Sequence, residues 1–177
     1  MRKVLYLLLA LFISVSMAAC SGEGKESGTQ ETTTQFIFTY PTKEAMNQAL
    51  KVQTEKQGLT LPEAEENALS QMTFYTYKFE ENVKLVVKID ANTGTVVNVE
   101  IDTRKTISDT QKALLDKLMH VVVASVEPRE TEEGINTIVD GWMNTETNGS
   151  GYPSSVGIIY TKETVGEEDM YAYYAKL

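Results

Sequence analysis

Three stretches of alternating apolar and polar residues, separated by two short turns, constrain the fold of this chain most. Residues 72–79, 83–89 and 96–102 each alternate with the period of two that places successive side chains on opposite faces of a strand. Residues 80–82 and 90–94 separate these stretches and are rich in turn-forming Asp, Asn and Gly. Turns this short join neighbouring antiparallel strands. The pattern therefore predicts a three-stranded antiparallel meander.

Helical patterns and a second pair of strands flank the meander. Apolar residues at spacings of three and four, together with capping residues, indicate helices. Four helices are expected: residues 42–57, a short one over 60–69 that begins with a Thr60–Glu63 capping box, one from Thr106 or Ser108 to Pro128, and one from Thr131 to Met143. Further strands are expected over residues 36–40, 156–161 and 170–177.

The order of these elements predicts an α+β fold. Helices and strands come in blocks rather than in strict alternation, which is typical of an antiparallel sheet with helices packed on one face. We expect the meander and a C-terminal hairpin to form that sheet. Residues 36–177 provide about 140 residues, which is enough for one domain with its own hydrophobic core.

The first twenty residues have the layout of a secretory signal. Arg2 and Lys3 provide a positive start, an apolar stretch follows to Val15, and small residues lead up to Cys20, the only cysteine. The apolar stretch is shorter than the about 20 residues that a membrane span needs. A single cysteine also excludes an intrachain disulfide and a cysteine-rich zinc site.

The sequence Met17-Ala18-Ala19-Cys20 resembles the lipobox of bacterial lipoprotein precursors. The resemblance covers the first twenty residues and implies that residues 1–19 are a signal peptide. It also implies that Cys20 becomes the N-terminus, carries a thioether-linked diacylglycerol and holds the protein on the extracytoplasmic face of a lipid bilayer. Two acyl chains are enough for stable anchoring. The alternatives are an ordinary cleaved signal with a chance cysteine and an uncleaved anchor helix.

The segment after the cysteine has the composition of a spacer. Residues 21–35 read SGEGKESGTQETTTQ and contain no apolar side chain, so they do not bury enough surface to offset the entropy of ordering. The expected organisation is a signal peptide over 1–19, a lipidated cysteine and flexible tether over 20–35, and a single domain over 36–177. The net charge of -9 argues against a nucleic-acid partner, which needs a basic footprint.

Motifs of the common catalytic classes are missing from the sequence, so no catalytic residue is assigned. His120, the only histidine, falls in an apolar helical stretch and is predicted to have a structural or surface role. Residues 90–94 look like the start of a calcium loop, but turn chemistry explains them without a cation. We therefore expect neither a cofactor nor a metal site.

Tyrosine is the residue type that most suggests binding. The pairs Tyr75 with Tyr77 and Tyr171 with Tyr173 fall in expected strands, so each pair shares one face of its strand. If these faces point away from the helices, the four rings form an exposed aromatic surface for a glycan, a peptide or another protein. The alternative is that β-propensity and cross-strand packing account for the tyrosines.

A second resemblance concerns one hairpin. Residues 84–97, KLVVKIDANTGTVV, are similar to the closing hairpin of PepSY-type domains, which often read v-D-A-x-T-G-x-V. Those domains are small extracytoplasmic modules, some of them linked to protease inhibition. The helical region that precedes the hairpin here departs from the pattern of that module.

Together these features predict a cell-envelope lipoprotein whose extracytoplasmic domain is a binding or interaction module. The expected partners are the lipid bilayer, through acylated Cys20, and an envelope protein, a peptide or a glycan. The first alternative is an extracytoplasmic hydrolase that uses paired carboxylates. A solute-capture lipoprotein is the second alternative, although the domain is short for the usual two-lobed architecture.

Overall fold

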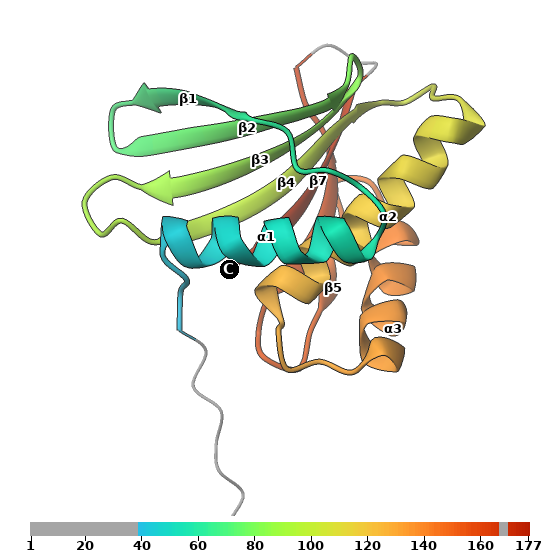
Figure 1. The fold of residues 1–177 in the computed structure, drawn as a ribbon. Coiled ribbons are helices and arrows are strands. Elements are labelled where there is room, and N and C mark those ends of the chain that lie inside the picture. The colour runs from blue at the N-terminus through green and yellow to red at the C-terminus, as the bar shows by residue number, and fades with distance from the viewer. Residues whose placement is uncertain (1–38, 167–169) are drawn as a thin grey trace, which may run out of the picture. The chain divides into compact units, whose positions relative to one another are not determined.

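The protein is described from a computed structural model that covers residues 39–166 and 170–177. A single seven-stranded antiparallel sheet, in the order β1-β2-β3-β4-β7-β6-β5, forms one layer (Figure 1). Its strands are β1 (Ala64–Leu69), β2 (Met72–Glu80), β3 (Val83–Asp90), β4 (Val96–Arg104), β5 (Tyr152–Pro153), β6 (Ile159–Thr164) and β7 (Met170–Lys176). The expected α+β class is confirmed.

The meander is present with the expected strands. β2, β3 and β4 pair antiparallel in sequence order, and β7 then pairs with β4, so the C-terminal hairpin extends the same sheet. Asp90 closes the turn after β3 because its Oδ1 accepts hydrogen bonds from the backbone N–H groups of Asn92 and Thr93. Gly94 follows with a φ of 69°, a conformation that favours glycine.

Three helices form the second layer: α1 (Lys43–Lys56), α2 (Asp109–Val126) and α3 (Glu132–Met143). Thr42, Ser108 and Thr131 cap their first turns through side-chain oxygens, as the sequence predicts. In the case of α2 the cap is a full capping box with Gln111. α2 packs between α1 and α3, and Figure 1 shows all three on one side of the sheet.

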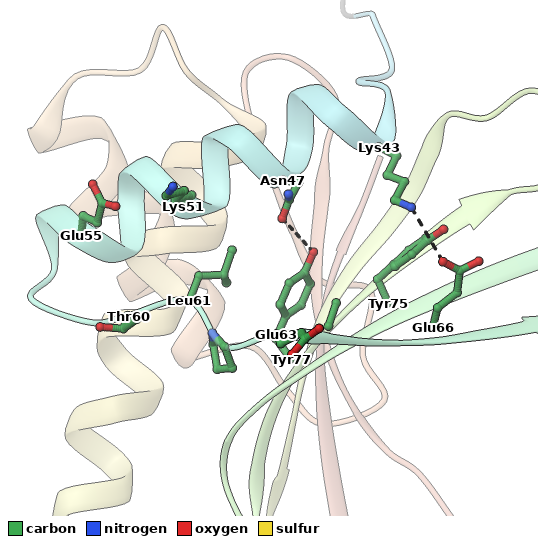
Figure 2. A pocket seen from close by; sticks show the side chains of 12 residues that line it. Lys43, Asn47, Lys51, Glu55, Thr60, Leu61, Glu63, Glu66, Tyr75 and Tyr77 are labelled. Carbon is green, nitrogen blue, oxygen red and sulfur yellow. Dashed lines mark hydrogen bonds and ion pairs between the residues drawn. The ribbon is translucent and has the colours of Figure 1, made fainter.

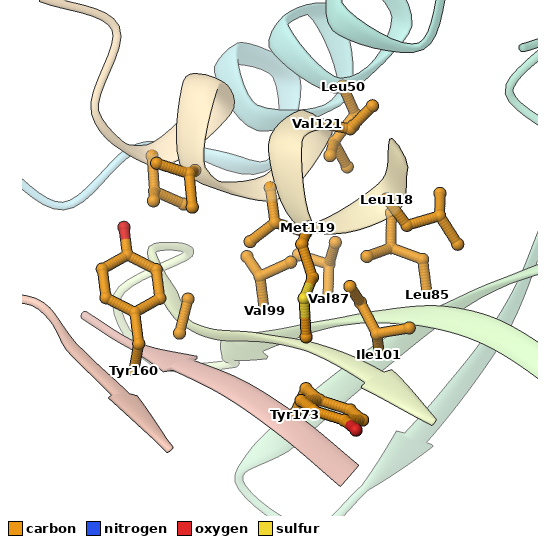
Figure 3. Close-up of a cluster of buried hydrophobic side chains, with 14 of the residues drawn as sticks. Leu50, Leu85, Val87, Val99, Ile101, Leu118, Met119, Val121, Tyr160 and Tyr173 are labelled. Atoms are coloured by element: carbon orange, nitrogen blue, oxygen red, sulfur yellow. The ribbon is translucent and has the colours of Figure 1, made fainter. Parts of the chain in front are cut away.

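The core lies between the helices and the sheet (Figure 3). Strand register brings Tyr77, Leu85, Ile101 and Tyr173 into one row across four strands on the helix-facing side. Leu118 and Met119 of α2 are fully buried above the sheet. Burying this apolar surface is the main favourable term in the stability of the domain.

The expected short helix over residues 60–69 is wrong. Residues 64–69 form β1, which pairs with β2 from Ala64–Tyr77 to Leu69–Met72. An isolated helix of that length has too few internal hydrogen bonds to be stable, whereas the strand gains a full ladder against β2. The capping pattern at Thr60 is therefore overridden by the tertiary pairing.

The other expectations differ in detail. The strand expected over 36–40 falls mainly outside the described residues, and Thr39 and Tyr40 are not in a strand. The expected strand over 156–161 starts three residues later, at Ile159, and the short strand β5 was not anticipated. Within the described part of the chain, no helix has the length and apolar character needed to cross a membrane.

Candidate functional site

A groove of about 560 Å³ lies between α1 and the outermost strands of the sheet (Figure 2). One wall is α1, the far end is the connection from α1 to β1, and the floor comes from β1 and β2. We call it the α1–β1 groove and define it by its lining residues: Lys43, Asn47, Lys51, Glu55, Thr60, Leu61, Pro62, Glu63, Ala64, Glu66, Tyr75 and Tyr77.

The helix wall of the groove is a polar stripe. Lys43, Asn47, Lys51 and Glu55 recur every four residues, and that spacing places them along one side of α1. Met46 and Leu50 lie one residue before Asn47 and Lys51, and both are buried in the core. One face of α1 therefore packs into the core, and another presents two lysines, an asparagine and a glutamate to the groove.

Two tyrosines of β2 form the floor. The Tyr77 hydroxyl donates a 3.1 Å hydrogen bond to Oδ1 of Asn47, which joins the sheet to the helix across the groove. Nζ of Lys43 lies 4.0 Å from the centre of the Tyr75 ring, a cation–π distance. The same ammonium is 3.8 Å from a carboxylate oxygen of Glu66 on β1.

Two groups of the groove, the Tyr77 hydroxyl and the Lys43 ammonium, have raised pKa values. Burial raises the pKa of the Tyr77 hydroxyl, which therefore keeps its proton and remains a donor. The Tyr75 hydroxyl raises the pKa of Lys43, and Glu66 acts in the same direction, so the ammonium stays charged. The groove thus offers two aromatic rings, fixed hydrogen-bonding groups and charges of both signs.

The four tyrosines expected on an exposed face lie on the covered face instead. Tyr75, Tyr77 and Tyr173 are buried and Tyr171 is half-buried, because their register places them opposite core residues such as Val87 and Leu85. They do not form one exposed aromatic surface, and this corrects that interpretation. Cross-strand packing, the alternative explanation, accounts for their burial.

The two tyrosine pairs also lie apart. Tyr75 and Tyr77 belong to the α1–β1 groove, whereas Tyr173 packs near Trp142 of α3 with ring centres 6.3 Å apart. Tyr171 contacts Tyr173 edge-on and has Lys105 and Lys162 near its ring, at 5.4 and 5.6 Å. Of the two pairs, Tyr75 and Tyr77 line the α1–β1 groove, and Tyr171 and Tyr173 do not.

Two carboxylates with raised pKa lie on the helix-free face of the sheet. Burial raises the pKa of Glu100 and of Asp102, which are two residues apart on β4. Each carboxylate forms an ion pair with a lysine. Glu100 Oε2 lies 2.6 Å from Lys88 Nζ, and Asp102 Oδ2 lies 3.7 Å from Lys84 Nζ. Neither lines the α1–β1 groove.

A third buried carboxylate lies near a second, smaller groove. Glu127, at the end of α2, accepts a 2.6 Å hydrogen bond from the Tyr160 hydroxyl, and burial raises its pKa. The second groove measures about 400 Å³ and lies at the start of α3, and its lining includes Glu130, Glu133 and Tyr152. Among the residues with described positions, no cluster of His, Cys, Asp and Glu suits a metal ion.

His120 and Cys20 complete the set of residues singled out from the sequence. The ring of His120 lies between the Asp116 carbonyl oxygen, 2.8 Å from Nδ1, and Asn136 Oδ1, 3.0 Å from Nε2. It therefore bridges α2 and α3. Cys20 and the expected tether lie outside the described residues.

The sequence missed the helix wall of the groove. Lys43, Asn47 and Lys51 have a visible spacing of four, but a polar helical stripe ordinarily faces solvent. These residues line a groove only because residues 64–69, expected as a helix, form the strand β1 beside them.

No family model, curated protein or solved structure matches this chain.

Proposed function

We propose that this protein is a cell-envelope lipoprotein, anchored through Cys20, whose α+β domain is a binding module with the α1–β1 groove as its ligand site. One observation carries the assignment of the site. The groove combines aromatic rings at Tyr75 and Tyr77 with polar groups of fixed orientation, which is the usual composition of a ligand site.

The anchor rests on the lipobox pattern and is tested separately from the groove. Replacing Cys20 by Ala removes the thiol that would carry the diacylglycerol, so we expect the protein to move from the membrane fraction to the soluble fraction. Mass spectrometry of the wild-type N-terminal peptide should show the lipid mass on Cys20. A Cys20→Ala protein that remains in the membrane fraction contradicts the anchor.

The groove is tested by photo-crosslinking in intact cells. A photoreactive amino acid at Lys51, which lines the groove, should give a discrete adduct to an envelope component. The same amino acid at Lys112 is the matched control, because that lysine is exposed in the first turn of α2 and lies outside the groove. Equal adducts at both positions, or none at Lys51, contradict the proposed site.

A hydrolase remains the second candidate because Glu100 and Asp102 both keep a raised pKa on one face of β4. Their lysine partners and their position outside both grooves rank this function below binding. Glu100→Gln and Asp102→Asn separate the two proposals. They should leave the Lys51 adduct unchanged, whereas a hydrolase would lose turnover of its substrate with either substitution.

A further inference from the structure

We propose that the outer edge of β1 pairs with an extended peptide that carries a basic residue and, two residues later, an apolar one. This inference rests on the proposed binding function and names the partner class for the α1–β1 groove. The peptide would add as an eighth strand, with alternate side chains entering the groove.

The edge of β1 is open in the described structure. β1 is the first strand in the sheet order, and five of its six residues are exposed. Its backbone makes hydrogen bonds to β2, and none joins its other edge to a further described segment. Such an edge presents unpaired N–H and C=O groups that another strand can use.

Strand register decides which backbone groups point outward. A two-residue connection, Ser70–Gln71, makes Leu69 and Met72 the closing hydrogen-bonded pair of the hairpin. Hydrogen bonding to β2 then alternates along the strand. The residues whose N–H and C=O groups face outward are Ala64, Glu66 and Ala68.

The same residues connect this edge with the groove. Ala64 pairs with Tyr77 and Glu66 pairs with Tyr75, so their side chains share the face covered by α1. A residue of an added strand that lies directly opposite Glu66 or Ala64 places its side chain on that face as well. Backbone pairing and side-chain insertion therefore use one register.

The two positions favour different side chains. Glu66 is more than half exposed, and its contact with Lys43 is an exposed pair, which is a weak interaction. A basic side chain opposite Glu66 can therefore compete for its carboxylate. Ala64 has a small side chain beside Leu61 and Tyr77, which leaves room for an apolar group. In an antiparallel addition the basic residue comes first.

Charge along the edge selects this partner over a second copy of the chain. Residues 57–77 contain three glutamates, at positions 63, 65 and 66, and no lysine or arginine. Two β1 strands pairing with each other would bring these glutamates close together, which is unfavourable. A basic peptide is attracted to the same edge.

The test uses two synthetic peptides and amide resonances of the full chain. One peptide is a short threonine-rich strand former with Lys and, two residues later, Leu; the other has Glu in place of Lys. Binding of the Lys peptide should shift and protect from exchange the amides of Ala64, Glu66 and Ala68. The Glu peptide should bind about tenfold more weakly.

A pair of charge reversals provides the specificity control. Glu66→Lys should invert the preference so that the Glu peptide binds more tightly. Glu65→Lys makes the same change of charge on the neighbouring residue, but Glu65 faces the opposite side of the sheet, where it contacts Lys78. We expect Glu65→Lys to retain the preference of the wild-type protein.

Three results would overturn the proposal. The first is that saturating Lys peptide leaves the edge amides unaffected. The second is that Glu66→Lys keeps the peptide preference of the wild-type protein. The third is that the edge amides are already protected from exchange without peptide. In the third case sedimentation assigns the edge to a second copy, if the protein is dimeric, or to the chain's own N-terminal segment, if it is monomeric. The Lys51 adduct in cells reports on the proposed function independently of all three.

Discussion

The Tyr160 hydroxyl donates a 2.6 Å hydrogen bond to Oε1 of Glu127, and both side chains are buried. Tyr160 belongs to β6 and Glu127 follows the last turn of α2, so this bond joins the sheet to the helical layer. The second carboxylate oxygen, Oε2, has no hydrogen bond of ordinary geometry within the described part of the chain. The Tyr160 hydroxyl is therefore the main partner of a buried acid.

Replacing Tyr160 by Phe should destabilise the protein by about 1–3 kcal/mol at pH 7, since the buried carboxylate loses a donor. The free energy of unfolding from urea titrations measures the change. Tyr152→Phe is the matched control, because Tyr152 is only half-buried and its hydroxyl makes no hydrogen bond among the residues with described positions. Equal small losses in both variants would show that the Tyr160 bond contributes little.

The stability of the protein should depend on pH through Glu127. Burial raises its folded pKa above the ordinary value of 4.5, with Tyr160 partly opposing the rise. Between these two pKa values the folded state binds more protons, so this group's contribution to stability is full below pH 4.5 and is lost as the pH rises.

Glu127→Gln isolates this contribution, because glutamine stays neutral and can still accept the bond from Tyr160. The free energy of unfolding of the variant minus that of the wild type should increase from pH 4 upward and then level off once the pH exceeds the folded pKa of Glu127. Chemical denaturation at several pH values gives this difference. A difference that does not vary with pH is incompatible with a raised folded pKa.

Gly141 of α3 gives a packing prediction. A Cβ atom at this position would lie 2.5 Å from Cδ2 and Cε2 of the Tyr152 ring. Although Ala is about 1 kcal/mol better than Gly in a helix, Gly141→Ala should destabilise by about 1–3 kcal/mol through overpacking. In a Tyr152→Ala background the same substitution should become stabilising, and thermal unfolding detects the change of sign.

Gly134→Ala is the control for this pair in the same helix. Its Cβ would meet the end of the Glu130 side chain, which can rotate into solvent, so the cost should be small. If Gly141→Ala costs the same with and without the Tyr152 ring, that ring is not the obstacle.

The meander was predictable because each strand is apolar on one face and two turns carry their own sequence signals. β1 was not, because five of its six residues are exposed and no apolar period marks it. Its stability comes from pairing with β2, and a single-sequence pattern does not contain that information.

The candidate site was predictable only in part. The sequence shows that Tyr75 and Tyr77 share one face of a strand, but not which face the helices cover. That depends on the packing of Met46 and Leu50 of α1 against the sheet, which brings Asn47 within reach of Tyr77. The groove is therefore a product of tertiary structure and has no local motif.

The turn between β1 and β2 provides a stabilising substitution. Ser70 has a φ of 55°, a left-handed conformation that costs a residue with a Cβ atom about 1 kcal/mol. Ser70→Gly should therefore raise the free energy of unfolding by about 0.5–1 kcal/mol. The control is Gln71→Gly, which should lower it, because Gln71 does not have a positive φ. Urea titrations of both variants should show opposite signs.

Removing the lysine from the ion pair between Lys88 and Glu100 should cost far more than removing the lysine from an exposed pair. Nζ of Lys88 is 2.6 Å from Oε2 of Glu100, whose side chain is only 8% exposed. Lys88→Met leaves that charge without its partner and should cost about 3 kcal/mol at pH 7.

The loss of stability caused by Lys88→Met should become smaller in acid, where Glu100 binds a proton. Adding Glu100→Gln to Lys88→Met should restore most of the lost stability at neutral pH. Lys78→Met is the matched control, because Lys78 and Glu65 form an exposed pair with side chains 58% and 65% exposed. Its cost should stay below about 1 kcal/mol. Equal costs for Lys88→Met and Lys78→Met would show that Glu100 is solvated in solution, and the raised pKa of its carboxyl would then be excluded as well.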